Sequence, residues 1–299
     1  MPRIHGRSPV SRGSGTVVPV FVEKTIRPPA SWCLFTCGMD PSLSVLVTGS
    51  SGRIGGAVVA ELIRRGHAVR GFDLTPTLGL ADCVAGDLTD RAALDRAMQG
   101  VHSLIHLAAT PDDADFLTEL LPNNITGLYH VMESARVAGV RRIILASSGQ
   151  VNWWQQRDGP FPIRPEDPTS PKHWYAATKM FMEAIGRSYT EIHGISVIVA
   201  RLGWCPRTRG QVKEIAASEL FRDVYFSPGD VGRFFACAVE ASADVRHAVV
   251  YGASRPVKQQ RFDMTSAREL LGYEPVESWP QGVEIVTGSP WPADTIFHK

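Results

Sequence analysis

A tyrosine and a lysine four residues apart are the first residues here whose types and spacing could do chemistry. Tyr175 and Lys179 lie in a segment with helical apolar spacing, so their side chains share one face of a helix. A free tyrosine has a pKa of about 10, and a nearby ammonium group favours the tyrosinate and lowers that pKa. The pair predicts a general acid–base group; an exposed pair on a solvated helix is the alternative.

Two adjacent serines, Ser147 and Ser148, end the apolar run 142–147 that precedes this helix. If that run is a strand, its carboxyl end lies on the side where open α/β sheets bind ligands. We therefore expect one of the two hydroxyls to hydrogen-bond a substrate oxygen as charge develops on it.

A glycine-rich turn occupies residues 48–55, TGSSGRIG, between an apolar run and a helical pattern. Gly49, Gly52 and Gly55 are spaced GxxGxxG, which permits a tight turn, close approach of a pyrophosphate and close packing of helix on strand. The free N–H groups of the helix N-terminus favour phosphate binding. The turn predicts a dinucleotide site that also includes Ser51, Arg53 and Ile54, with a plain strand-to-helix turn as the alternative.

An acidic residue, Asp73, ends the second apolar run, 18 residues after Gly55. Its carboxylate can accept hydrogen bonds from adenine-ribose hydroxyls and would repel a 2′-phosphate, which predicts NAD rather than NADP. Two roles of Arg53 remain open: a contact with a cofactor phosphate, or a solvated arginine on the surface. Asp87 and Leu88 are expected at the adenine edge, although Asp87 could instead cap the helix that begins near Asp90.

The elements that must position these residues alternate between strands and helices. Apolar or β-branched runs predict strands over 43–48, 68–74, 82–85, 102–107, 142–147, 195–202 and 248–251. Helical spacing predicts helices over 54–66, 90–99, 116–138, 174–193, 231–240 and 265–271. The alternation predicts an α/β Rossmann-type fold, a doubly wound parallel sheet with a small C-terminal substrate lobe built mainly from 203–299.

Composition fits this fold and excludes several classes of protein. The 299 residues are 44% hydrophobic and 20% charged, as in an ordinary globular protein, which excludes a disordered, collagen-like or coiled-coil chain. The net charge of +1 argues against a nucleic-acid partner or an anionic membrane. The sequence has no run of 18 apolar residues, so it predicts no membrane span. Five scattered cysteines do not suggest a disulfide framework, so we expect a reducing, cytoplasmic compartment.

Residues 1–38 differ from the rest of the chain. They hold five basic residues and one acidic residue, are rich in Ser, Gly and Pro, and show no period. Three interpretations remain open: an organelle transit peptide, a disordered tail, or a segment upstream of a true start at Met39. Residues 39–299 are then expected to form a single domain. Cys33 and Cys37 have no partner pair nearby, so we expect no metal site.

Taken together, these motifs resemble the extended short-chain dehydrogenase/reductases, the NAD-dependent epimerase/dehydratase group. The resemblance runs from about Leu43 to the C-terminus and is carried by TGSSGRIG at 48–55, Asp73, GDL at 86–88, HLAA at 106–109, NNITGLYHVMESAR at 123–136, SS at 147–148 and YAATK at 175–179. It implies that Tyr175 is the general acid–base, Lys179 its modulator and Ser148 the polarising serine. It also implies cofactor contacts from Leu107, Ala108, Ala109, Asn124, Tyr175 and Lys179.

Within this group the chain resembles the bacterial uronate dehydrogenases, which oxidise the C1 hydroxyl of a sugar acid. The matching segments are 124–136, 145–148, 251–254, 262–275 and 294–299. The chain departs from the subfamily at Gly149-Gln150, where the family has Asn-His, and at Trp204, where it has a small polar residue. We expect Gln150 and Trp204 to contact the substrate. Arg209 is expected to bind a substrate carboxylate, with Arg207 and Lys213 as alternatives.

The resemblance implies an NAD-dependent dehydrogenase acting on a hydroxyl of a sugar or sugar acid. The alternatives are an epimerase or reductase acting on another polyol or nucleotide sugar, or a non-catalytic NAD-binding protein. A small sugar-like molecule is the expected partner. A homodimer through 116–138 and 174–193 is a further expectation.

Overall fold

The computed structural model describes residues 42–284, which form a seven-stranded, wholly parallel sheet in the order β3-β2-β1-β4-β5-β6-β7. The strands are β1 (Ser44–Thr48), β2 (Ala68–Asp73), β3 (Cys83–Ala85), β4 (Ser103–His106), β5 (Arg142–Ser148), β6 (Ser196–Leu202) and β7 (His247–Gly252). Every strand expected from the sequence is present, and the predicted doubly wound fold is confirmed. The extension 1–38, Met39 and the 294–299 segment lie outside the described residues.

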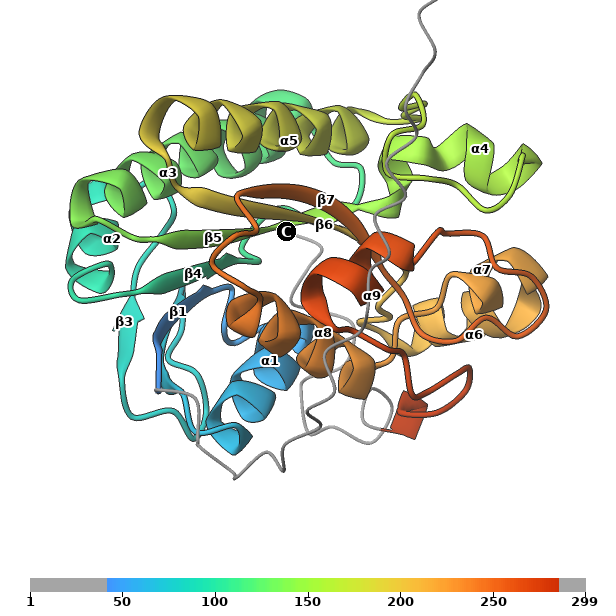
Figure 1. Cartoon of the computed structure of the whole chain (residues 1–299), viewed down its shortest axis with the longest axis horizontal. Coiled ribbons are helices and arrows are strands. Elements are labelled where there is room, and N and C mark those ends of the chain that lie inside the picture. Colours follow the sequence, from blue (N-terminus) through green and yellow to red (C-terminus); the bar gives the residue numbers. More distant parts are fainter. Residues whose placement is uncertain (1–41, 285–299) are drawn as a thin grey trace, which may run out of the picture. The chain divides into compact units, whose positions relative to one another are not determined.

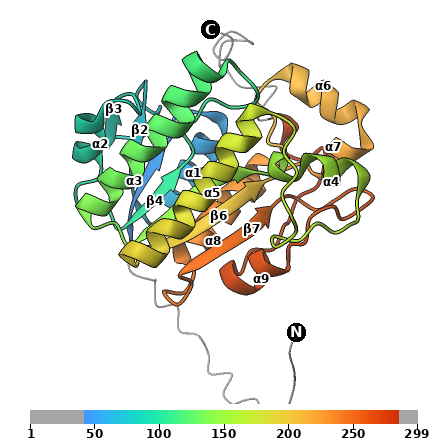
Figure 2. The ribbon, with the colours of Figure 1, turned by 90° about the horizontal axis from the view of Figure 1, so that it is seen from above.

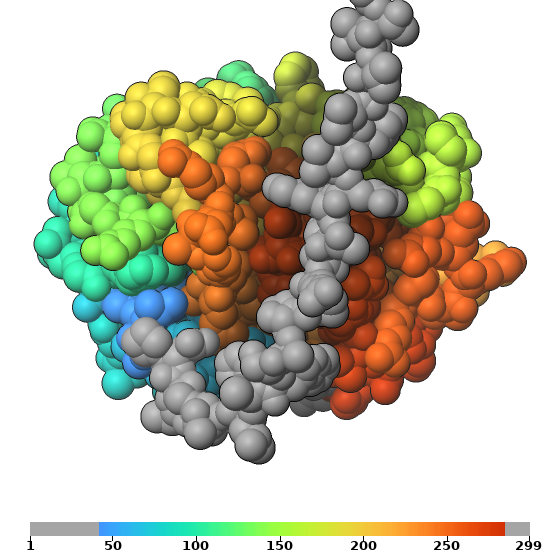
Figure 3. All heavy atoms as spheres, in the orientation of Figure 1, coloured from blue at the N-terminus to red at the C-terminus, as the bar shows by residue number. Residues whose placement is uncertain are grey.

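Helices cover both faces of the sheet. The helices α2 (Arg91–Ala97), α3 (Gly127–Ala138) and α5 (Trp174–His193) lie on one face, and α1 (Arg53–Arg64), α8 (Pro228–Glu240) and α9 (Thr265–Leu271) lie on the other (Figures 1 and 2). On the face of Figure 3, the orange and red C-terminal part of the described chain lies at the centre and lower right. No helix within residues 42–284 has both the length and the apolar character needed to cross a membrane.

The core is split into two layers by the alternation of side chains along each strand. In β1, Val45 and Val47 join the cluster under α1 and α8, whereas Leu46 joins the cluster under α2 and α3. The same alternation separates Ile144 from Leu145 in β5. Because successive side chains of a strand point to opposite faces, a continuous run of apolar residues is needed when both faces are buried.

The predicted helix 116–138 is divided in the structure. Its first part, η1 (Phe116–Thr126), is a π-helix that contains Pro122, and α3 begins only at Gly127. Proline has no N–H to donate and crowds the preceding turn, so an ordinary α-helix cannot run through it undisturbed. The amide of Gly127 closes this wider turn on the carbonyl of Pro122. Our expectation of one regular helix over 116–138 was therefore wrong for residues 116–126.

Several short helices follow the carboxyl ends of β5 and β6 and were not expected from the sequence. They are α4 (Trp153–Asp158), which follows a short helical turn at 149–152, and α6 (Arg209–Ala217) and α7 (Glu219–Asp223). Both ribbon views place these three helices together at one end of the sheet. Within the expected lobe of 203–299, β7 and α8 belong instead to the central layers, because β7 pairs with β6 and α8 packs on α1.

Candidate active site

The glycine turn between β1 and α1 has a backbone that only glycine allows. Gly49 has φ +73°, and a Cβ there would lie 2.8 Å from the Ala108 amide nitrogen. A Cβ on Gly55 would lie 2.0 Å from the carbonyl oxygen of Gly49. The N-cap residue of α1, Gly52, makes no side-chain cap, so the helix N-terminus carries no side chain of its own over its first amides. This is the cradle that the pyrophosphate of a dinucleotide requires.

Asp73 lies beside this turn and is fixed by main-chain donors. Its Oδ2 accepts from the Ser51 amide at 2.9 Å, and its Oδ1 accepts from the Leu74 amide at 2.7 Å. The carboxylate therefore stays at the end of β2, where it can receive ribose hydroxyls. Arg53, the first residue of α1, is partly buried, and this burial lowers its pKa.

The other residues expected at the cofactor are spread along the neighbouring loops. Asp87 accepts from the amide and hydroxyl of Thr89, both at 2.7 Å, while Asp90 caps α2, so the alternative of an Asp87 cap was wrong. Leu88 is buried. Leu107 and Ala109 line the main cavity, and the amide of Ala108 donates to Thr48 Oγ1 at 3.3 Å.

Asn124 is buried and holds the loop after β4 in place. Its Oδ1 accepts from the Thr110 amide at 2.8 Å, and its Nδ2 donates to the Thr110 carbonyl at 3.1 Å and to Thr178 Oγ1 at 3.2 Å. These bonds tie Thr110 to α5. A direct contact of Asn124 with the cofactor remains a prediction.

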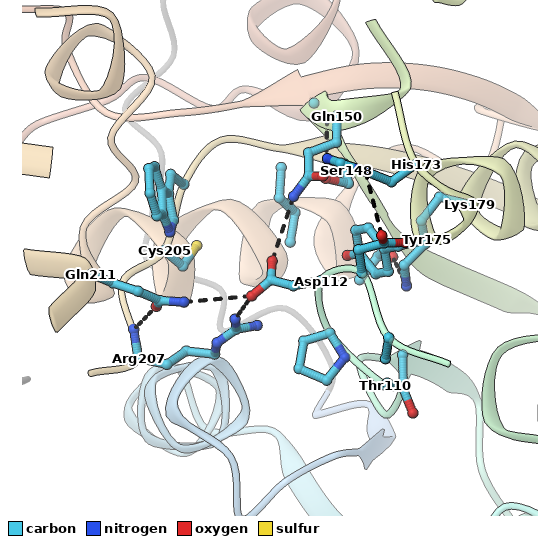
Figure 4. A pocket seen from close by; sticks show the side chains of 18 of the residues that line it. Thr110, Asp112, Ser148, Gln150, His173, Tyr175, Lys179, Cys205, Arg207 and Gln211 are labelled. Atoms are coloured by element: carbon cyan, nitrogen blue, oxygen red, sulfur yellow. Dashed lines mark hydrogen bonds and ion pairs between the residues drawn. The ribbon is translucent and has the colours of Figure 1, made fainter. Parts of the chain in front are cut away.

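The proton-transfer group is assembled from β5 and α5. Lys179 Nζ donates to the carbonyl of Ala146 at 2.9 Å and lies 5.5 Å from the Tyr175 ring centre. The side chains of Tyr175 and Ser148 are hydrogen-bonded to each other. Figure 4 shows the three side chains gathered at one side of the cavity. The structure thus brings together the three residues predicted to be catalytic.

Burial sets the protonation states of this group. It raises the pKa of Tyr175 to about 12, with a further rise from Asp112, while Arg207 and the hydrogen bond to Ser148 act in the opposite direction. Burial lowers the pKa of Lys179 to about 8. Tyr175 is therefore a neutral phenol here, and further positive charge must arrive nearby before it can serve as a base.

The two serines at the end of β5 have different partners. Ser147 donates to Glu183 Oε1 at 2.6 Å, and Glu183 forms a buried ion pair with Arg201 at 2.8 Å. Ser148 Oγ instead accepts from the Gln150 amide at 3.1 Å. Since that bond uses an oxygen lone pair, the hydroxyl hydrogen of Ser148 can be donated to Tyr175 or to a substrate oxygen.

A cavity of about 1230 Å³ opens beside this group, at the carboxyl ends of β4, β5 and β6. Its aromatic wall consists of Trp153, Trp204 and Phe221, with the rings of Trp204 and Phe221 edge to face at 4.5 Å. Trp204 and Gln150, both expected at the substrate, line the cavity. Trp154, the residue after Trp153, is exposed and stacks under Arg157, outside this wall.

An ion pair between Asp112 and Arg207 lies across this cavity, and the sequence reasoning missed Asp112. Arg207 Nη2 contacts Asp112 Oδ2, and Gln211 Nε2 lies 3.5 Å from the same oxygen. Arg209 is exposed and does not line the cavity, nor does Lys213, so the structure favours Arg207 among the three candidates. The signal for Asp112 was its place just after a strand end, where ligand-binding side chains gather.

Within residues 42–284, no group of three or more His, Cys, Asp or Glu side chains is placed to hold a metal ion.

The fold and these side chains define a Rossmann-type protein with a short-chain dehydrogenase/reductase site. Residues 45–204 match the family model "NAD dependent epimerase/dehydratase family". The chain is 31% identical over 258 residues to the L-arabinose 1-dehydrogenase (NAD(P)(+)) of Haloferax volcanii, a match that covers 80% of this chain and 99% of the relative. It is 29% identical over 262 residues to the uronate dehydrogenase of Pseudomonas syringae, covering 85% and 89%.

Solved structures agree. The glucuronic acid dehydrogenase of Chromohalobacter salexigens superimposes with a TM-score of 0.68 at 26% identity, over 83% of this chain and 89% of that one. The chain belongs to the NAD-dependent epimerase/dehydratase family, as its motifs suggested.

Proposed function

We propose that this protein is an NAD-dependent dehydrogenase that oxidises a hydroxyl group of a sugar or sugar acid. The observation that carries the proposal is the placement of Tyr175, Ser148 and Lys179 together at the cavity, next to the glycine cradle. A module that only binds a dinucleotide has no use for a tyrosine hydrogen-bonded to a serine beside a buried lysine. The relatives named above are dehydrogenases of sugars and sugar acids, which supports the same conclusion.

The reaction converts a CH–OH group of the substrate to a carbonyl group and releases one proton. When bound, NAD supplies the oxidising power, because it takes the carbon-bound hydrogen with both bonding electrons. The hydroxyl proton of the substrate passes to the Tyr175 oxygen, and the C=O double bond forms as it leaves. Ser148 donates its free hydrogen to the same substrate oxygen and holds it in line with Tyr175.

Lys179 prepares Tyr175 for this step. Its ammonium group has three donors, of which one is used on the Ala146 carbonyl. The other two are available to ribose hydroxyls of the cofactor, and its charge favours the tyrosinate. The positive charge of the oxidised cofactor acts in the same direction, so we expect the pKa of Tyr175 to fall from about 12 when NAD binds.

The test is a screen for NADH formation, followed by absorbance, over aldoses, uronic acids and inositols with the full chain. The proposal predicts turnover with a member of the first two groups. Tight NAD binding without turnover of any of these compounds would contradict it and would favour a non-catalytic protein.

We also propose a homodimer in a reducing, cytoplasmic compartment. The outer face of α3 and α5 exposes the apolar side chains of Tyr129, Val137, Phe181 and Ile192, which supports a contact between two copies. Cys83, Cys205 and Cys237 are free thiols, as a reducing compartment would keep them. Sedimentation of the wild type and of Phe181→Glu tests the dimer: a monomeric wild type would contradict it.

A further inference from the structure

The carboxylate of Asp112 places a negative charge at a fixed position in the substrate cavity. Asp112, in the segment after β4, has φ +62° and is the one non-glycine residue among 42–284 with a positive φ. Aspartate tolerates this left-handed conformation better than most residues, and such strain persists only where the surroundings hold it. Figure 4 shows its carboxylate between Tyr175 on one side and Arg207 with Gln211 on the other.

The arginine best placed to bind a substrate anion is already paired with Asp112. Besides this ion pair, the amide of Arg207 donates to Gln211 Oε1 at 2.8 Å, which fixes the segment that carries it. Gln150 Nε2 lies 3.5 Å from Asp112 Oδ1, so donors face both carboxylate oxygens. A substrate carboxylate that bound Arg207 would have to displace Asp112 and would then face its charge at close range.

The remaining charges of the cavity increase this repulsion. The described residues that line it include two basic side chains, Arg207 and Lys179, against the carboxylates of Asp112, Asp113, Asp115, Glu119 and Glu214. Lys179 Nζ donates a hydrogen bond to the Ala146 carbonyl, and His173 Nδ1 lies 3.4 Å from Asp113 Oδ2. A sugar acid would therefore enter a field of its own sign, whereas a neutral sugar would not.

We propose that the substrate is a neutral aldose, and that Asp112 selects it by accepting hydrogen bonds from ring hydroxyls and repelling sugar acids. This inference rests on the proposed function, since it names the substrate class of the same site. An ionised carboxylate only accepts hydrogen bonds, and its two oxygens match two adjacent hydroxyls of a sugar ring. The wall of Trp204 and Phe221 is suited to the apolar C–H face of that ring.

A matched series of sugars tests this selectivity directly. L-Arabinose, D-galactose and D-galacturonate share the same ring configuration and differ only in the group on C5: hydrogen, hydroxymethyl or carboxylate. The reaction removes the C1 hydrogen with its electron pair to NAD and the C1 hydroxyl proton to Tyr175, giving the lactone, NADH and a proton. We expect kcat/KM for a neutral member to exceed that for galacturonate by about tenfold or more.

Asp112→Asn isolates the charge, because asparagine keeps the shape and also tolerates the left-handed backbone. It should shift the ratio of kcat/KM values toward galacturonate by about tenfold. Asp113→Asn is the matched control: it removes an adjacent charge of the same cavity, but one that faces His173, and should shift the ratio far less. Calorimetry of D-galactose and D-galacturonate with the NAD complex of Tyr175→Phe should show the same preference without turnover.

The outcomes separate the two proposals. Preference of the wild type for galacturonate, or a ratio unchanged by Asp112→Asn, would overturn this inference and leave a sugar dehydrogenase in place. An equal shift from Asp113→Asn would assign the selectivity to overall charge and overturn the role of Asp112. If none of the sugars reduced NAD, the proposed function itself would be overturned.

Discussion

Ser147 donates a 2.6 Å hydrogen bond to Glu183, and this contact separates the roles of two serines that the sequence places side by side. Glu183 is itself paired with the buried Arg201, so Ser147 belongs to a buried network that joins β5, α5 and β6. Ser148, one residue further, is bonded to Tyr175. Ser147 therefore supports the end of β5, and Ser148 lies beside the proton-transfer group.

Alanine substitutions should therefore have opposite signatures at these two positions. Ser148→Ala removes a donor to the reacting oxygen and should lower kcat by about 10²–10³-fold with a near wild-type melting temperature. Ser147→Ala leaves a buried carboxylate without one donor and should lower the free energy of unfolding by about 1–3 kcal/mol while retaining turnover. Steady-state kinetics and denaturant titrations of both variants give the comparison. Equal losses of kcat would contradict the assignment.

The glycine cradle offers a second matched pair. Gly55→Ala would place a methyl group 2.0 Å from the Gly49 carbonyl, so the turn must distort, and NAD binding should be lost along with stability. Gly56→Ala, one residue on in the same helix, meets nothing within 4 Å and should be neutral or stabilise by up to about 1 kcal/mol. Melting temperatures and NAD titrations measure both effects. An intact NAD site in Gly55→Ala would show that the turn is not the phosphate cradle.

Cofactor choice should depend on Asp73. The Ser51 and Leu74 amides fix its carboxylate beside the cradle, where a 2′-phosphate would be repelled. We expect NAD to bind more tightly than NADP, and Asp73→Ser to narrow the difference by about tenfold or more. Asp82→Asn, which removes an exposed carboxylate paired with Arg70, serves as the control. Fluorescence titrations that gave equal affinities for the two cofactors in the wild type would contradict the prediction.

His106 should make the fold sensitive to acid. Burial, aided by the charge of Lys179, lowers its pKa from 6.5 to about 3, and its Nδ1 lies 2.8 Å from Thr48 Oγ1. Between these two pH values the unfolded chain binds a proton that the folded chain does not, so its contribution to stability is present above pH 6.5 and is lost as the pH falls. The loss has an upper limit of about 1.4 kcal/mol per pH unit.

Denaturant titrations at pH 6.5 and pH 4.5 measure this slope. His106→Asn should be less stable at the higher pH, because a buried ring is removed, yet lose less stability than the wild type on acidification. Parallel pH dependences of the two proteins would show that His106 is not the group responsible.

How much of this site the sequence could predict depends on how far apart its parts lie in the chain. The glycine turn and the Tyr175–Lys179 pair are local patterns, because a few neighbouring residues set both the backbone and the chemistry. Asp112 and Arg207 lie 95 residues apart and meet only because β4 and β6 are both in the sheet, on either side of β5. Neither residue type nor spacing identified Asp112, and the sequence favoured Arg209 over Arg207.

The same limit applies to the fold. Central strands such as β1, β5 and β6 could be predicted because each is an apolar run buried on both faces, a signal contained in the run itself. The short helices α6 and α7 could not, since they span only nine and five residues, too few for a clear apolar period. Pro122 marks a break in the predicted helix 116–138, but a proline alone does not determine that the chain widens into the π-helical turn of the structure.

The central claim is that Tyr175 carries the proton, and Tyr175→Phe tests it most directly. The change removes one hydroxyl and keeps the ring, so NAD should bind with nearly unchanged affinity by fluorescence titration. NADH formation from the best substrate of the screen should fall by about 10²–10⁴-fold, the usual contribution of a general acid–base group. A variant that binds NAD normally and retains most of its turnover would mean that the proton leaves through another group, and the dehydrogenase mechanism assigned to Tyr175, Ser148 and Lys179 would be wrong.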